Sequence, residues 1–167
     1  QDRSSAASDV YKRQIITISF LVFIFISILI SVNLMKYIIF NWKSYLNISE
    51  SMNLSKVVSK LPSTKKYKLI SSPNNFYNLT LKSRYPKNIY AAQNVDLHGK
   101  GASTGSIDIQ DLVSNKIKFC ILGHSEVRSN FGETDLIIQK KTDLCLHNKI
   151  TPIVCIGEPV DLSLIHI

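Results

Sequence analysis

Lysine and histidine side chains that could act on an anionic carbonyl compound follow directly after apolar segments of strand length. Lys43 follows one such segment, and His124 follows another. A fixed ammonium favours an anionic substrate, and an imidazole can donate a hydrogen bond to a carbonyl oxygen or to an enediolate. We expect Glu126, the carboxylate in the His124 loop, to orient the lysine or to take part in proton transfer. These residues predict proton transfer beside the carbonyl group of a phosphorylated or otherwise anionic small molecule.

Five apolar segments separated by longer stretches must position these side chains. Each segment is of strand length and lacks the alternation of a half-solvated sheet, which is typical of buried parallel strands joined by helical crossovers. The sequence therefore predicts an α/β protein built from repeated strand–helix units. The predicted strands are Tyr37–Phe40, Tyr67–Ile70, Ile89–Ala92, Lys118–Leu122 and Thr151–Ile156.

Three amphipathic segments predict crossover helices. The first has Asn47 or Ser49 as its N-cap and ends before Pro62. A second follows Ser106, and a third covers residues 134–148. The apolar side chains that we expect to face the sheet are Leu54, Val57, Val58 and Leu61 in the first helix, Ile109, Leu112 and Val113 in the second, and Leu136, Ile137, Leu144 and Cys145 in the third.

Polar and ionisable residues gather where the predicted strands end. Asn41 and Lys43 follow the first strand, Gln93 the third, His124 and Glu126 the fourth. In α/β proteins, and above all in eight-stranded barrels, the carboxyl ends of the strands carry the active site. The sequence therefore predicts one site at this edge of the sheet.

Six short motifs resemble those of the triosephosphate isomerase family, in the family's order and at its spacing. They are NWK at 41–43, AQNV at 92–95, GASTG at 101–105, LGHSE at 122–126, FGET at 131–134 and PIVCIGE at 152–158. The resemblance implies a (β/α)8 barrel that interconverts dihydroxyacetone phosphate and glyceraldehyde 3-phosphate in glycolysis and gluconeogenesis. It also implies a cytoplasmic enzyme that needs no cofactor and no metal.

The resemblance also implies roles for the residues at the strand ends. Asn41 and Lys43 would bind the substrate, and Lys43 would offset the charge of the phosphate and of the enediolate. His124 would be the electrophile, donating to the carbonyl oxygens as a neutral imidazole, as the family's histidine does. Glu126 would be a supporting acid, hydrogen-bonded near Lys43.

A homodimer follows from the same resemblance. The loop with Thr104 at its tip, followed by Gly105, would reach into the partner subunit, and we expect Gln93 to lie at the interface. Two positions depart from the family pattern. Val127 stands where an Arg is usual, and Ser106 where a Glu is usual, so we expect one interface or loop contact to differ.

Only five strand–helix units are recognised, whereas a full barrel has eight. We therefore expect a barrel truncated after about the fifth strand, covering residues 35–158. The resemblance implies a catalytic base, a Glu in a later strand-end motif, and glycine-rich phosphate-binding loops after the last strands. Glu158 does not substitute for the base because it belongs to the fifth-strand motif. We predict that the chain as given is inactive.

Residues 1–34 and 159–167 are expected to lie outside this barrel. From Gln14 to Leu34 there are 21 residues without a charge, which is long enough to cross a membrane. A membrane span at residues 15–34, a signal peptide, and translated adapter or non-coding sequence all explain this segment, and we favour the last. The alternative function is a membrane-anchored protein, held by a single span, with a small non-catalytic α/β binding domain.

The net charge of +8 is dispersed along the chain and predicts no nucleic-acid site. Cys120, Cys145 and Cys155 are odd in number and form no C-x-x-C pair. They therefore predict buried thiols in a reducing compartment, and neither a zinc site nor a redox motif.

Overall fold

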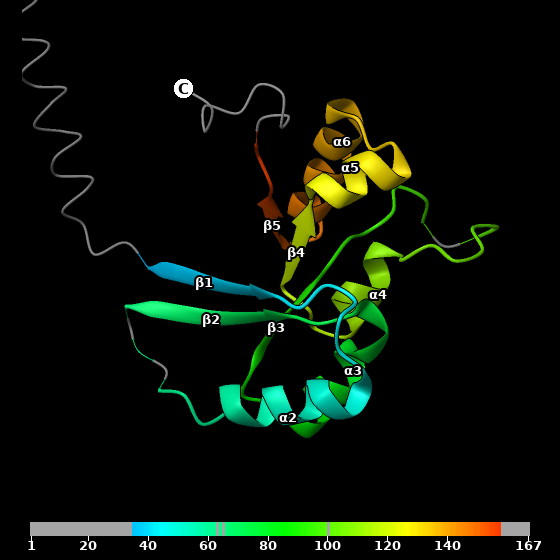
Figure 1. The fold of residues 1–167 in the computed structure, drawn as a ribbon. Helices are drawn as coiled ribbons and strands as arrows, with labels where there is room; N and C mark the ends of the chain where they lie inside the picture. The colour runs from blue at the N-terminus through cyan, green and yellow to red at the C-terminus, as the bar shows by residue number, and fades with distance from the viewer. Residues whose placement is uncertain (1–34, 63, 65, 100, 158–167) are drawn as a thin grey trace, which may run out of the picture. The chain divides into compact units, whose positions relative to one another are not determined.

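The computed structural model describes residues 35–62, 64, 66–99 and 101–157 (Figure 1). The chain divides into two compact units, residues 1–36 with 64–67, and residues 37–63 with 68–167. In the first unit, the backbone N–H of Lys36 donates to the carbonyl oxygen of Lys66 at 2.9 Å. Every other contact described below lies within the second unit. The proposed membrane span at residues 15–34 falls outside the described residues, and no helix within those residues is long and apolar enough to cross a bilayer.

The five predicted strands are present and form one sheet in chain order. Parallel pairing sets Ile70 opposite Ile89, and Ala91 opposite Phe119. Parallel strands in sequential order, each followed by a helical crossover, are the arrangement of an α/β barrel, so the predicted fold class is confirmed. The strands are β1 (Lys36–Asn41), β2 (Tyr67–Ser72), β3 (Ile89–Ala92), β4 (Phe119–Leu122) and β5 (Thr151–Val154).

The three predicted helices are confirmed as α2, α4 and α6. Three further elements were not predicted from the sequence: η1, α3 and α5. Each of these is short, and α3 begins without a side-chain cap. The helices are α2 (Ile48–Val58), η1 (Asn75–Tyr77), α3 (Asn78–Arg84), α4 (Ile109–Ser114), α5 (Ser125–Phe131) and α6 (Asp135–His147).

A capping box begins helix α2. The Asn47 side chain accepts a hydrogen bond from Glu50 N at 3.0 Å, and the Glu50 side chain accepts one from Asn47 N at 2.9 Å. Two backbone N–H groups that the first helical turn would leave unpaired are thus satisfied. The choice of Asn47 over Ser49 as the N-cap is settled by this pair.

The buried face of α2 differs in part from the predicted one. Val58 is buried as predicted, but Leu54, Val57 and Leu61 are exposed, and Ser51 and Ser55 are buried in their place. These small side chains let the helix approach the sheet closely, and hydrogen bonds hold it there: the carbonyl oxygen of Ser55 accepts from the Asn88 side chain at 2.9 Å, and its hydroxyl lies 3.3 Å from the Tyr90 hydroxyl. Hydrogen bonds at Ser55 therefore contribute to setting which face of α2 turns inward.

Helix α6 lies beside β4 and β5 (Figure 1) and also departs in part from its predicted face. Leu136 is exposed, while Ile138, Lys141 and Cys145 are buried. These three follow one another at spacings of three and four residues, the spacing of one helix face. A lysine therefore occupies the middle of the face that packs on the sheet.

The main hydrophobic core lies between the sheet and its helices, and a smaller apolar cluster lies among β2, β3 and β4. Burial of each large apolar side chain contributes roughly 1.5–3 kcal/mol. Strands β3 and β4 are the most deeply buried strands of the sheet, and they lead directly into Gln93 and His124. The main core includes Leu81, Tyr90, Ala92, Val95, Ile109, Leu112, Ile117, Cys120, Leu122, Ile138, Cys145 and Ile150, and the smaller cluster is Ile70, Ala91 and Phe119.

Candidate active site

The turn after β1 is fixed at both sides of Lys43. Trp42 is buried in the main core, and its backbone N–H donates to the carbonyl oxygen of Ser72 at 3.0 Å. The side chain of Asn41 accepts from Lys43 N at 3.0 Å. Lys43 itself has φ of +51°, in the left-handed region that residues other than glycine seldom adopt. Such backbone strain persists only where the surroundings impose it, and it concentrates at functional sites.

Lys43 and Glu126 meet although 83 residues separate them. The ammonium Nζ of Lys43 donates to Oε1 of Glu126 at 2.6 Å. This hydrogen bond raises the pKa of Lys43 and lowers the pKa of Glu126. Both groups are therefore charged at neutral pH. The structure brings together the cation and the acid that the sequence analysis singled out.

His124 is the N-cap of α5, and its ring is oriented by the helix that it caps. The ring Nδ1 accepts a hydrogen bond from Glu126 N at 3.3 Å. An imidazole nitrogen that accepts an N–H carries no hydrogen, so a neutral ring bears its hydrogen on Nε2. Nε2 is then a donor to a bound group. Arg128 Nε donates to the carbonyl oxygen of Gly123 at 2.8 Å and steadies the turn that precedes the histidine.

A pocket of about 380 Å³ joins these side chains. Gln93 forms part of its wall: its Nε2 donates to the carbonyl oxygen of Lys43 at 2.8 Å and to that of Ser72 at 3.0 Å. These two hydrogen bonds from the Gln93 side chain hold the turn that carries Lys43 in place. The pocket is lined by Asn41, Lys43, Ser44, Tyr45, Gln93, Ile121, His124, Glu126, Val127, Asn130 and Phe131.

This arrangement can bind an anion and polarise a carbonyl group. A positive ammonium and a neutral N–H donor line the same concave space, and the carboxylate of Glu126 orients the ammonium. Donors placed where negative charge develops stabilise an enediolate. Among the described residues no three His, Cys, Asp or Glu side chains gather as metal ligands do.

The loop that carries Thr104 and Gly105 stands apart from this pocket. Both residues are exposed, and neither lines the pocket of its own chain. The loop closes at its base on Asp96, whose N–H donates to the carbonyl oxygen of Ile107 at 3.0 Å and whose side chain accepts from Ile107 N at 2.7 Å. Gly105 has φ of +84°, which suits glycine at the loop tip.

Comparison with known proteins shows which family the chain belongs to. The sequence profile of the family described as triosephosphate isomerase matches residues 36–163. The chain belongs to the triosephosphate isomerase family. The triosephosphate isomerase of Mycoplasma mobile is 34% identical over 130 residues, 74% of this chain and 54% of the relative. That of Clostridium acetobutylicum is 35% identical over 123 residues, 72% and 50% of the two chains.

A third relative, the triosephosphate isomerase of Flavobacterium psychrophilum, is 40% identical over 122 residues, 71% of this chain and 48% of the relative. The chain thus spans about half the length of the curated relatives that it matches. The residues that match the family, 36–163, include all those that line the pocket.

A second polar cluster in this triosephosphate isomerase family chain was not predicted as such. Lys141 Nζ is hydrogen-bonded to Glu133 Oε1 and lies 3.3 Å from the side-chain oxygen of Asn94. Asn94 also donates to Glu133 Oε1 at 3.0 Å, and Asp96 Oδ1 lies 3.7 Å from Lys141 Nζ. The lysine in the middle of the apolar face of α6 was the signal that could have revealed it.

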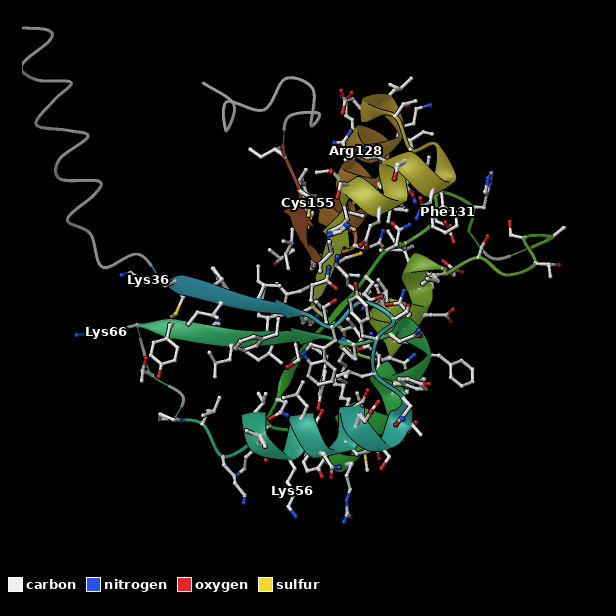
Figure 2. The ribbon with its side chains drawn as sticks, viewed as in Figure 1. Lys36, Lys56, Lys66, Arg128, Phe131 and Cys155 are labelled. Carbon is white, nitrogen blue, oxygen red and sulfur yellow. The ribbon has the colours of Figure 1, made fainter. Side chains whose placement is uncertain are left out.

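The sequence analysis did not assign Ser44, Tyr45, Ile121, Asn130 or Phe131 to the site, yet all five line the pocket. The aromatic side chains of Tyr45 and Phe131 are 80% and 78% exposed. Phe131 lies on α5 with Arg128 (Figure 2). Phe131 stands in one of the family motifs and Tyr45 two residues after Lys43, so proximity to the motifs was the available signal. Val127, which departs from the family pattern, also lines the pocket.

Proposed function

We propose that the protein contributes the substrate-binding and electrophilic half of a triosephosphate isomerase site, formed by residues 35–158. The single observation that carries the proposal is the meeting of Lys43, Glu126 and His124 in one pocket, with Lys43 Nζ 2.6 Å from Glu126 Oε1. The substrates are dihydroxyacetone phosphate and glyceraldehyde 3-phosphate, and the role is glycolytic and cytoplasmic. Membership of the family supports this assignment.

Each residue has a distinct task in this proposal. The isomerisation removes a proton from the carbon beside the carbonyl group, forms an enediolate and returns the proton to the neighbouring carbon. Lys43 offsets the negative charge of the phosphate and of the enediolate. His124 donates from Nε2 to the substrate oxygens. Asn41 fixes the Lys43 backbone, and Glu126 holds the ammonium until the substrate arrives.

The 167 residues assayed alone should show no turnover. The base that the family resemblance implies is a Glu in a later strand-end motif than those of residues 35–158, and Glu126 is the supporting acid that orients Lys43. Removing an essential general base leaves only binding and charge stabilisation. Conversion of glyceraldehyde 3-phosphate by the purified chain well above the rate in buffer would contradict this part of the proposal.

Binding is tested separately by the amide resonances of the ¹⁵N-labelled chain. Dihydroxyacetone phosphate should shift the signals of Lys43 and His124. Glycerol 3-phosphate, which lacks the carbonyl group, should shift Lys43 and leave His124 nearly unchanged. The variant Lys43→Met should abolish both responses, while Lys140→Met, which removes an exposed charge on α6, should retain them. Equal responses of His124 to the two ligands would refute its role as electrophile.

We further propose that two copies associate through the loop that bears Thr104. Its exposure and its closed base, together with two exposed aromatic residues beside the pocket, support an interface in which the loop of one copy packs against Tyr45 and Phe131 of the other. Sedimentation velocity tests this. Thr104→Arg should shift the chain from dimer to monomer, and Gln139→Arg, an exposed control on α6, should not. Unchanged sedimentation in Thr104→Arg would exclude this interface.

A further inference from the structure

Most acidic and basic side chains of the second unit lie at opposite ends of the strands, although the charges are dispersed along the sequence. All the described acidic residues except Asp143 lie in segments that join the carboxyl end of a strand to the first turn of a following helix. From Ser51 to Val95 the sequence contains no Asp or Glu, and this stretch supplies the amino ends of β2 and β3. Acidic side chains at helix starts complement the helix dipole, but that effect does not account for lysines in the turns before strands.

Three lysines lie close together at the amino end of β4. Nζ of Lys82, on α3, donates to the carbonyl oxygen of Asn115 at 2.8 Å and to that of Lys116. Burial, followed by the nearby charges of Lys116 and Lys118, lowers the pKa of Lys82. Among the described residues none of the three lysines forms an ion pair. Their positive charges therefore repel one another without a carboxylate to offset them.

A second pair of lysines lies at the amino ends of β2 and β3. The parallel register sets Ile70 opposite Ile89, so Lys68 and Lys87, each two residues earlier, stand at the same level of the sheet. Both line a hollow of about 170 Å³. The remaining wall is mostly apolar and consists of Val58, Ser59, Leu61, Pro62, Leu69, Asn88 and Ile89. Two ammonium groups thus stand beside an apolar hollow, and the side chain of Leu61 there is 45% exposed.

Helix α3 and the turn after it connect the two groups of lysines. Arg84 ends α3 two residues after Lys82, and Lys87 follows in the turn that leads into β3. Most of these basic side chains are exposed. The basic face is defined as Lys68, Lys82, Arg84, Lys87, Lys116 and Lys118. We propose that the basic face and its apolar hollow dock on the surface of an anionic phospholipid bilayer.

An anionic phospholipid matches both features of this face. Its phosphate is attracted by clustered lysines, and its apolar part covers the hollow beside Leu61. A nucleic acid would match the charges alone, because the described residues that line the hollow include no aromatic ring on which a base could stack. Docking through this face leaves the pocket of Lys43 and His124 accessible, since that pocket lies at the carboxyl ends of the strands.

Vesicle sedimentation with the full chain tests the proposal. One set of vesicles contains one part phosphatidylglycerol to two parts phosphatidylcholine, and the other contains phosphatidylcholine alone. The chain should bind the charged vesicles at least about tenfold more tightly, and added salt should remove the difference. The segment at residues 15–34 carries no charge. Any binding that it contributes does not depend on lipid charge, so the ratio of the two affinities reports the basic face.

Charge reversal locates the contact. Lys87→Glu should lower the affinity for charged vesicles at least about tenfold, because it changes the basic face by two units of charge. Lys140→Glu makes the same change at an exposed position in the middle of α6 and should have a much smaller effect. Leu61→Ser should also weaken binding to charged vesicles, because it removes an apolar side chain from the hollow.

The proposal fails if wild type binds charged and neutral vesicles equally, or if Lys140→Glu loses as much affinity as Lys87→Glu. Polyuridylate RNA is the competing polyanion. If RNA binds as tightly as the charged vesicles, and Leu61→Ser leaves both affinities unchanged, the basic face is a nucleic-acid surface and the assignment to lipid is wrong. The comparison of vesicles with the wild-type chain is decisive by itself, so a variant that folds poorly does not leave the proposal untested.

Discussion

Two lysine–glutamate pairs in this chain differ sharply in their surroundings. In the pocket, the side chains of Lys43 and Glu126 are 36% and 48% exposed, whereas those of Lys141 and Glu133 are 4% and 8% exposed. The exposed pair has water as an alternative partner, and the buried pair has only its cluster. The two pairs therefore have different roles. Lys43 can exchange Glu126 for a bound ligand, whereas the Lys141–Glu133 pair holds α6 and the segment before it together.

The difference follows from the cost of desolvation. A charge removed from water is tolerated only when another charge and hydrogen bonds replace the lost hydration. Around Lys141 this replacement comes from Glu133, Asn94 and Asp96, which belong to segments before α6 and at the base of the Thr104 loop. The buried cluster thus ties α6 to that loop. An exposed pair such as Lys43–Glu126 adds little stability, since solvent screens it.

The largest effect should come from breaking the buried pair. Lys141→Met leaves the Glu133 carboxylate buried without its cation, and we expect a loss of about 3–5 kcal/mol in the free energy of unfolding. Urea denaturation measures it. Lys140→Met, at the exposed neighbouring position, should leave the free energy of unfolding nearly unchanged. A similar, small effect for both variants would remove the distinction between the two pairs.

A smaller effect is expected at Gly123, which lies between the two regions, just before His124 and against α6. A Cβ there would stand 2.9 Å from Ile138 Cδ1, and φ is +67°. Gly132 is the matched control, because its φ is +68° and a Cβ there would meet nothing within 4 Å. Gly123→Ala should cost about 1–3 kcal/mol more than Gly132→Ala in urea denaturation. Equal costs would show that backbone strain alone, and not the α6 contact, constrains this turn.

The smallest effect should be the pH dependence of the exposed pair. Lys43 lowers the pKa of Glu126, so any stabilisation is present above the ordinary glutamate pKa and is lost as the pH falls through the lowered value. Glu126 raises the pKa of Lys43, so the same contribution is lost as the pH rises through that higher value. The urea midpoints of wild type and Glu126→Gln should differ slightly at neutral pH and converge at both extremes. A gap that widens in acid would contradict this.

The five strands were predictable because each is a short apolar run, and all five appear within two residues of the predicted ends. The expectation that all of them are buried is wrong for the two end strands of the sheet, since β1 is largely exposed and β5 only partly buried. Asn41, Lys43, His124 and Glu126 were predictable because strand ends and family motifs mark them. The inward face of α2 was not fully predictable. Ser55 forms hydrogen bonds with Asn88 and Tyr90, and the periodicity of apolar residues gives no information about such contacts.

The buried cluster escaped prediction for a related reason. Lysine is usually a surface residue. Lys141 can be buried because Glu133, Asn94 and Asp96, which belong to other segments, lie around its ammonium group. The position of Lys141 in the middle of the apolar face of α6 is a local signal, but the residues that pair with it are set by the folded arrangement.

The most direct test of the central claim is the ¹⁵N resonance pair of the His124 imidazole, followed while dihydroxyacetone phosphate is added at neutral pH. The hydrogen bond from Glu126 N to Nδ1 predicts a neutral ring with its hydrogen on Nε2, and a shift of the Nε2 signal as the substrate carbonyl accepts from it. A ring that carries its hydrogen on Nδ1, or an Nε2 signal that does not respond to saturating ligand, would contradict the assignment of His124 as the electrophile.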